Sequence, residues 1–199
     1  MLLSASAAAK PWTMPVPADW TDTTAQMKNT PAILAMKRQI TGKGGTFSAS
    51  TFSSPDGATL FVATIEVAMP ETLSGVLAYE RGARDSSKQA GREASYREER
   101  TDTTLNATQR IAGLGVPIVV KRFIGMLESG GLRAVNVTCY GEPTICDPLI
   151  AAASVDTPAY APLERLGEPR TPLSYKLGAF TGMVLLAILL AMYFRRHRR

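Results

Sequence analysis

The C-terminal part of the chain contains an 18-residue run without a charged residue, 177–194, and this run most limits how the chain can fold. At about 1.5 Å per residue, a helix of that length spans about 27 Å, close to the thickness of the bilayer's hydrocarbon core. Its apolar residues surround the helix, whereas a helix on a protein core is apolar along one face. The run therefore predicts a single C-terminal transmembrane helix, whose anchoring residues include Leu177, Phe180, Val184, Leu185, Leu189, Tyr193 and Phe194.

Four arginines follow the apolar run directly: Arg195, Arg196, Arg198 and Arg199. Without them, 18 of the 22 Lys and Arg residues remain against 17 Asp and Glu, so residues 1–194 are nearly neutral. Nucleic-acid binding requires a basic stripe or patch on the folded surface, and this charge balance does not indicate one. We therefore expect the lipid bilayer and another membrane or membrane-associated protein as partners, and no nucleic acid.

The same arginines predict the orientation of the chain, because basic residues beside a membrane helix resist translocation. We expect the tail at 195–199 in the cytoplasm and the folded body outside it. Residues 1–9 leave a second topology open. They resemble the end of a signal peptide, but they lack its basic start and its full apolar segment. If they are only a flexible N-terminus, the chain is a tail-anchored protein with a cytosolic body, as at the mitochondrial outer membrane.

Proline positions divide the rest of the chain. Pro158, Pro162, Pro169 and Pro172 predict a semi-extended linker between the body and the membrane helix. The expected organisation has five parts: a flexible N-terminus or signal-peptide remnant over 1–10, one globular domain over 11–155, a linker over 156–176, the transmembrane helix over 177–194, and a basic tail over 195–199.

Short strand patterns dominate the globular part. A turn sequence at 54–57 separates two strand-like segments, and Phe61, Ala63 and Ile65 fall on one face of the second. A helix follows from Pro70 to near Gly91, because proline suits the first turn of a helix and glycine its end. Further strands are expected over 93–103, 106–112, 116–127 and 132–140, and a last helix from Pro143. This order predicts an α+β fold in which helices pack on an antiparallel sheet.

The opening residues Val16-Pro17-Ala18-Asp19-Trp20 and the element order over 12–155 resemble those of PsbP-like domains. The resemblance implies an antiparallel sheet between helices. It also implies an accessory or assembly role on a membrane rather than catalysis, with no catalytic motif to transfer to this chain. A C-terminal membrane segment departs from the N-terminal targeting or lipid attachment that is usual in that family.

Few residues of the body suggest chemistry. The single histidine, His197, lies in the basic tail, which excludes a histidine-dependent catalytic site or a histidine-ligated metal in the body. Cys139 and Cys146 lie near a strand end and a helix start, where a disulfide would stabilise the fold by about 2–3 kcal/mol. Two reduced thiols are the alternative. Their spacing is not Cys-x-x-Cys, and two thiols make a poor zinc site, so no catalytic residue, cofactor or metal is expected.

The leading hypothesis is therefore a membrane-anchored, non-catalytic accessory domain. The alternative is a membrane-anchored enzyme or small-ligand carrier that uses carboxylates, for which the candidates are Asp19, Asp22, Glu66 and Asp102. Acid–base chemistry by such groups requires the fold to bring two of them within several ångström. The alternating charges of 92–102 indicate a solvated sheet face or, alternatively, a partner-binding edge. Asn106 and Asn136 match glycosylation sequons.

Overall fold

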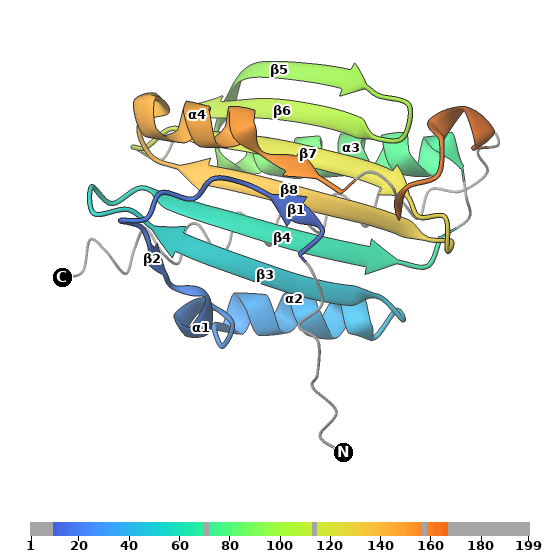
Figure 1. Ribbon diagram of the computed structural model, residues 1–199, viewed down its shortest axis with the longest axis horizontal. Coiled ribbons are helices and arrows are strands. Elements are labelled where there is room, and N and C mark those ends of the chain that lie inside the picture. The colour runs from blue at the N-terminus through green and yellow to red at the C-terminus, as the bar shows by residue number, and fades with distance from the viewer. Residues whose placement is uncertain (1–9, 70–71, 113–114, 157–158, 167–199) are drawn as a thin grey trace.

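The computed structural model describes residues 10–69, 72–112, 115–156 and 159–166. Its centre is a seven-stranded sheet with the order β2-β3-β4-β8-β7-β6-β5, in which every neighbouring pair is antiparallel (Figure 1). The strands are β2 (Thr21–Asp22), β3 (Thr46–Ser53), β4 (Thr59–Val67), β5 (Arg92–Arg100), β6 (Leu105–Ala112), β7 (Ile118–Met126) and β8 (Leu132–Tyr140).

Helices cover both faces of this sheet. Two long helices pack on one face, α3 behind the sheet in Figure 1 and α2 along its lower edge, while α4 and a two-stranded ribbon lie on the other face. The remaining elements are α1 (Thr24–Met27), α2 (Pro31–Thr41), α3 (Leu73–Ser87), η1 (Lys88–Ala90), α4 (Pro143–Ala152), η3 (Leu163–Arg165), and the ribbon strands β1 (Trp12–Thr13) and β9 (Ser154–Val155). The predicted α+β architecture is confirmed.

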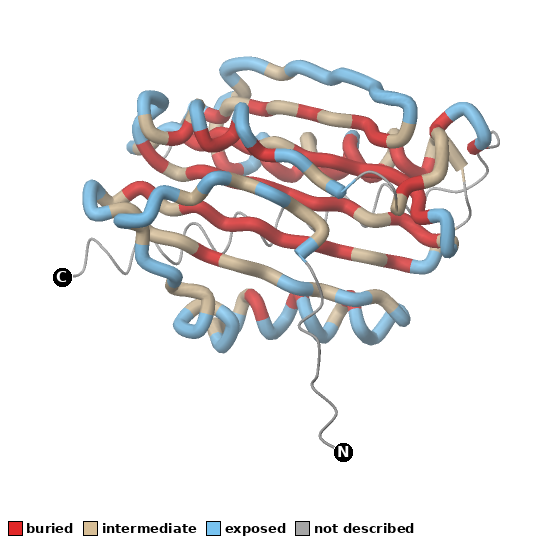
Figure 2. Tube along the Cα trace, in the orientation of Figure 1, coloured by how far each residue is buried: buried red, intermediate tan, exposed pale blue. Residues whose placement is uncertain are grey.

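The alternation of side chains along β4 produces two cores. Phe61, Ala63 and Ile65 are buried under α2 and α3, whereas Leu60 and Val62 are buried under α4. Figure 2 shows that this burial runs through the central strands and fades at the edge strand β5. Because β4 is buried on both faces, it reads as an almost continuous apolar run.

The chain beyond the last sheet strand does not form a linker over its full expected length. Residues 159–166 pack against the domain: Tyr160 and Leu163 are buried, and the Ala161 N–H donates a 2.7 Å hydrogen bond to the Met126 carbonyl. The expected boundary at 156 is therefore wrong for this stretch. Proline fixes an extended backbone, but it does not prevent the residues between two prolines from burying apolar side chains.

The expected membrane helix and basic tail lie outside the described residues, as do residues 1–9 of the expected N-terminal part. Within the ranges that the structure describes, no helix has both the length and the apolar composition needed to cross a bilayer.

Candidate functional site

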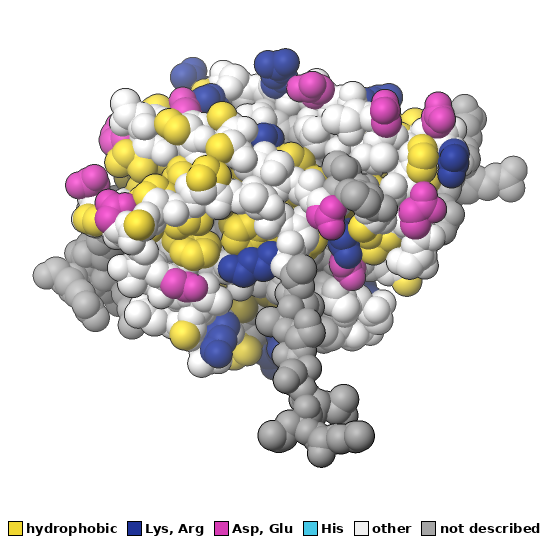
Figure 3. All heavy atoms as spheres, viewed as in Figure 1, with side chains coloured by type: hydrophobic (Ala, Val, Ile, Leu, Met, Phe, Trp, Pro, Cys, Tyr) yellow, Lys and Arg dark blue, Asp and Glu magenta, His cyan; other side chains and the backbone are white. Residues whose placement is uncertain are grey.

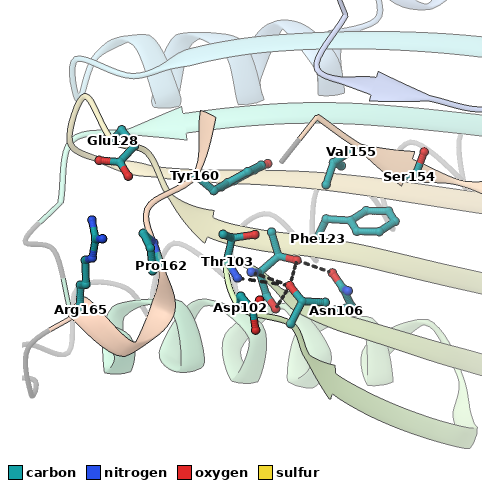
Figure 4. Close-up of a pocket in the computed structure, with 12 residues that line it drawn as sticks. Asp102, Thr103, Asn106, Phe123, Glu128, Ser154, Val155, Tyr160, Pro162 and Arg165 are labelled. Carbon is teal, nitrogen blue, oxygen red and sulfur yellow. Dashed lines mark hydrogen bonds between the residues drawn. The ribbon is translucent and has the colours of Figure 1, made fainter. Parts of the chain in front are cut away.

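An open groove of about 680 Å³ lies on the face of the sheet that also carries α4. In Figure 4, Glu128 and Arg165 lie at one end of it, Ser154 and Val155 at the other, and Tyr160 between them. We call it the Thr104 groove. Its lining residues come from five separate parts of the chain: Thr101, Asp102, Thr103, Thr104, Asn106, Phe123, Glu128, Ser154, Val155, Tyr160, Pro162 and Arg165.

The polar side of the groove is built by the turn between β5 and β6. The Thr101 and Thr104 hydroxyls are 2.9 Å apart, and the Thr104 hydroxyl donates to Asn106 Oδ1 at 3.0 Å. The Thr104 N–H donates to the Thr101 hydroxyl at 3.0 Å, so side chains and backbone hold the turn together. Hydroxyl and amide groups both donate and accept hydrogen bonds, which suits recognition of other polar, uncharged groups.

Two aromatic rings form the apolar part. Phe123 comes from β7, and Tyr160 lies over Gly125 of the same strand, where a Cβ atom would collide with the tyrosine ring. Gly125 is therefore required at this position because the ring packs directly on its backbone. Burial raises the pKa of Tyr160 to about 12, so this phenol stays neutral at physiological pH.

Three attachments position α4, whose last turn leads into the Ser154–Val155 wall of the groove. At its start, Cys146 is joined to Cys139 of β8 by a buried disulfide. At its end, Lys121 Nζ donates to the carbonyls of Ile150 (3.2 Å) and Ala153 (2.9 Å). A cation there satisfies free carbonyl groups and interacts favourably with the helix dipole. An ion pair of 2.6 Å between Arg110 and Asp147 holds the middle.

The four candidate carboxylates are not brought together. Asp22 accepts a 2.8 Å hydrogen bond from the Thr24 N–H, and its bonding to Thr24 lowers its pKa. Glu66 forms an ion pair of 2.7 Å with Arg133. The two lie at opposite ends of the β3 ladder, about 20 Å apart at 3.3 Å per residue, because Asp22 pairs with Phe52 and Glu66 with Thr46. Asp19 is exposed before β2, and of the four Asp102 alone lines the groove.

The structure also shows the environment of two other features singled out from the sequence, a glycosylation sequon and a charged segment. Asn136 is fully buried on β8, and its amide donates to the Tyr79 hydroxyl at 3.4 Å, so its sequon cannot accept a glycan in the folded protein. Residues 92–100 form the edge strand β5, whose charged side chains are largely exposed. The expectation of a solvated face therefore holds for most of them. Glu93 is an exception, because it forms an ion pair with Arg84 of α3.

A buried polar network beneath α3 was not predicted from the sequence. Arg122 of β7 and Glu80 of α3 are 1% and 2% exposed, with Nε and Oε2 3.3 Å apart. Arg122 also donates to Gln109, whose amide in turn donates to Glu93 at 2.9 Å. Burial raises the pKa of Glu80, and the charge of Arg122 opposes that rise. The network joins α3 to three strands, β5, β6 and β7.

In the described ranges, no group of three or more His, Cys, Asp or Glu side chains converges where a metal ion could be held.

Comparisons with known proteins leave the family open. No protein family and no curated protein matches this sequence. Among solved structures, it is similar to a crystal structure from Bacteroides thetaiotaomicron VPI-5482 at 1.50 Å resolution, with 13% identity and a TM-score of 0.36. The match covers 73% of this chain and 45% of that chain. A likeness of this size assigns neither family nor activity.

Proposed function

We propose that this protein is a membrane-anchored accessory domain that binds a partner protein in the Thr104 groove without catalysing a reaction. The observation that carries the proposal is the groove itself, which is open and combines threonine hydroxyls and an asparagine amide with two aromatic rings. Enclosed cavities suit small substrates, whereas an open surface with aromatic and uncharged polar groups is typical of a protein interface. The proposed anchor is the apolar run 177–194.

The proposed place of the folded body is the extracytoplasmic side, with the tail at 195–199 in the cytoplasm. The four arginines of the tail support this orientation, and the Cys139–Cys146 disulfide supports it independently because disulfides persist in oxidising compartments. A tail-anchored protein with a cytosolic body is the alternative. A PsbP-like relationship is part of the same proposal and rests on the opening motif and element order alone.

Site-specific photo-cross-linking in the protein's own membrane tests partner binding. A photoreactive residue at Glu128 or Arg165 samples the groove, and the matched control is Asp56, an exposed residue in the turn at the other end of the sheet. We expect one defined adduct from the groove positions that is missing from the control. Equal adducts at all three positions, or none at either groove position, would contradict the proposal.

A small-ligand carrier is the second candidate. It is favoured by one observation: Asp102, Glu128 and Arg165 line the same groove and supply charges of both signs. Native mass spectrometry of the full chain purified from its own membrane distinguishes the two functions. A carrier retains a small molecule that the double variant Asp102→Asn/Glu128→Gln loses, whereas an accessory domain has the mass of the chain alone.

A further inference from the structure

Besides the edge at β5, the sheet has an open edge along β3. Within the described residues, other parts of the chain form hydrogen bonds with the outward backbone groups at both ends of β3, but not with those in its middle. At one end the Gly45 N–H donates to the Ile40 carbonyl at 3.0 Å. At the other end the Thr23 N–H donates to the Thr51 carbonyl at 2.8 Å, and β2 pairs only with Phe52 and Ser53. In an antiparallel sheet, alternate residues point their backbone groups to each side.

Thr51 and Gly45 both bond away from β4, so the residues between them with the same orientation are Phe47 and Ala49. Over the described residues, no strand pairs with their outward N–H and C=O groups. These four backbone groups span about 7 Å along β3, the rise from Phe47 to Ala49, which a bound strand of three residues can match.

A pocket of about 290 Å³ lies beside this free edge, between β3 and the two N-terminal helices. We call it the β3–α2 groove. Its apolar wall includes Met27, Ile33 and Leu34, and Leu34 is the single large apolar side chain that is strongly exposed in the described residues. An edge strand next to a helix, with an apolar pocket between them, is the geometry in which an added peptide strand is bound through its backbone and its alternate side chains.

The two charged residues that line this groove are both basic. Lys28 and Lys37 line it and are exposed, and Arg38 and Lys43 lie close by in sequence. Between Asp22 and Asp56 the chain has no acidic residue at all. Figure 3 shows dark blue side chains at the lower margin of the molecule, over α1 and α2. Negative charge on a bound segment therefore strengthens its binding to this groove.

We propose that the β3–α2 groove binds an extended acidic segment of a partner protein, which adds to β3 as a strand. Its backbone pairs with Phe47 and Ala49, its apolar residues at alternate positions enter the pocket, and its carboxylates lie near Lys28 and Lys37. This surface is separate from the Thr104 groove, which lies on the other face of the sheet. The free backbone and the pocket favour a peptide over an anionic lipid surface, which needs charge alone.

Two measurements on the full chain in detergent test the inference, with a seven-residue peptide of alternating Glu and Val as the probe. Fluorescence anisotropy should show saturable binding that weakens at least tenfold in Lys28→Glu/Lys37→Glu. The matched control, Arg38→Glu/Lys43→Glu, changes the charge equally outside the groove and should bind within about twofold of wild type. Hydrogen–deuterium exchange at single-residue resolution should show new protection of the Phe47 and Ala49 amides.

Several outcomes would overturn the inference. Equal binding of a Lys–Val peptide would show that the basic residues do not select an acidic segment. Equal weakening in both double variants would show that general charge attraction dominates. Binding to phosphatidylserine vesicles without peptide binding would assign the basic surface to lipid instead. Phe47 and Ala49 amides that are already protected without peptide would show that the edge is occupied within the chain. None of these outcomes depends on the cross-linking result at the Thr104 groove.

Discussion

Glu80 and Arg122 form an ion pair that is almost wholly removed from water, with both side chains at most 2% exposed. Removing one partner of such a pair leaves a buried charge without its counterion. We expect Glu80→Gln to lower the free energy of unfolding by about 3–5 kcal/mol, measured by urea denaturation. Replacing both residues by methionine should recover most of that loss. A single variant within about 1 kcal/mol of wild type would contradict this expectation.

Glu93 gives the protein a defined sensitivity to acid. Arg84 donates to both of its carboxylate oxygens, at 2.8 and 2.6 Å, and holds its pKa below the ordinary value. The pair therefore stabilises the fold at neutral pH, and this contribution is lost as pH falls through the lowered pKa of Glu93. Glu93→Gln should flatten the fall of unfolding free energy between about pH 5 and pH 2. Identical pH profiles for variant and wild type would show that the pair contributes nothing.

At the scale of elements, the segment 159–166 depends on the absence of a side chain at Gly125. A Cβ atom there would collide with the Tyr160 ring and lie 2.8 Å from the Thr103 carbonyl oxygen. Gly125→Ala should therefore displace the segment, destabilise the protein by about 1–3 kcal/mol, and expose the Ala161 and Leu163 amides to hydrogen exchange. Tyr160→Phe keeps the ring and is the control. If Ala161 and Leu163 stay protected in Gly125→Ala, the packing argument is wrong.

The element scale also shows where sequence patterns succeed. The antiparallel hairpin of β7 and β8 was predictable, because two apolar runs flank Glu128-Ser129-Gly130-Gly131, and Gly130 and Gly131 adopt φ of +88°. The ends of α3 were less predictable. The helix begins at Leu73, and the Thr72 hydroxyl accepts a 3.1 Å hydrogen bond from the Gly75 N–H, whereas the expected start at Pro70 lies outside the described residues.

At the scale of the whole molecule, the proposed orientation predicts which part of the chain is accessible from outside the cell. Protease added to intact cells or spheroplasts should digest residues 10–166 and leave a small membrane fragment. When the same preparation is denatured without a reductant, Cys139 and Cys146 should resist alkylation until a reductant is added. A body that is protected until the membrane is broken, with two thiols that are alkylated in denaturant without any reductant, would instead indicate the tail-anchored topology.

The net charge of the chain as a whole does not reveal the basic surface near its N-terminal helices. The near-neutral balance of residues 1–194 argued against a basic patch, yet the acid-free stretch between Asp22 and Asp56 builds α1, α2 and β3 together. The net charge of short successive segments of the sequence would have identified this stretch. It would not have shown that Lys28 and Lys37 flank a free strand edge, because that depends on how α2 packs against β3.

The sequence by itself determined the α+β architecture, since side-chain alternation, turn residues and helix periodicity are local properties of neighbouring residues. The sequence also indicated that Cys139 and Cys146 lie close together, because few residues separate them. Only the tertiary structure decided which residues form each groove. Thr104, Phe123 and Tyr160 meet because β6, β7 and the last described segment converge, and no local pattern encodes a contact between residues so far apart in the chain.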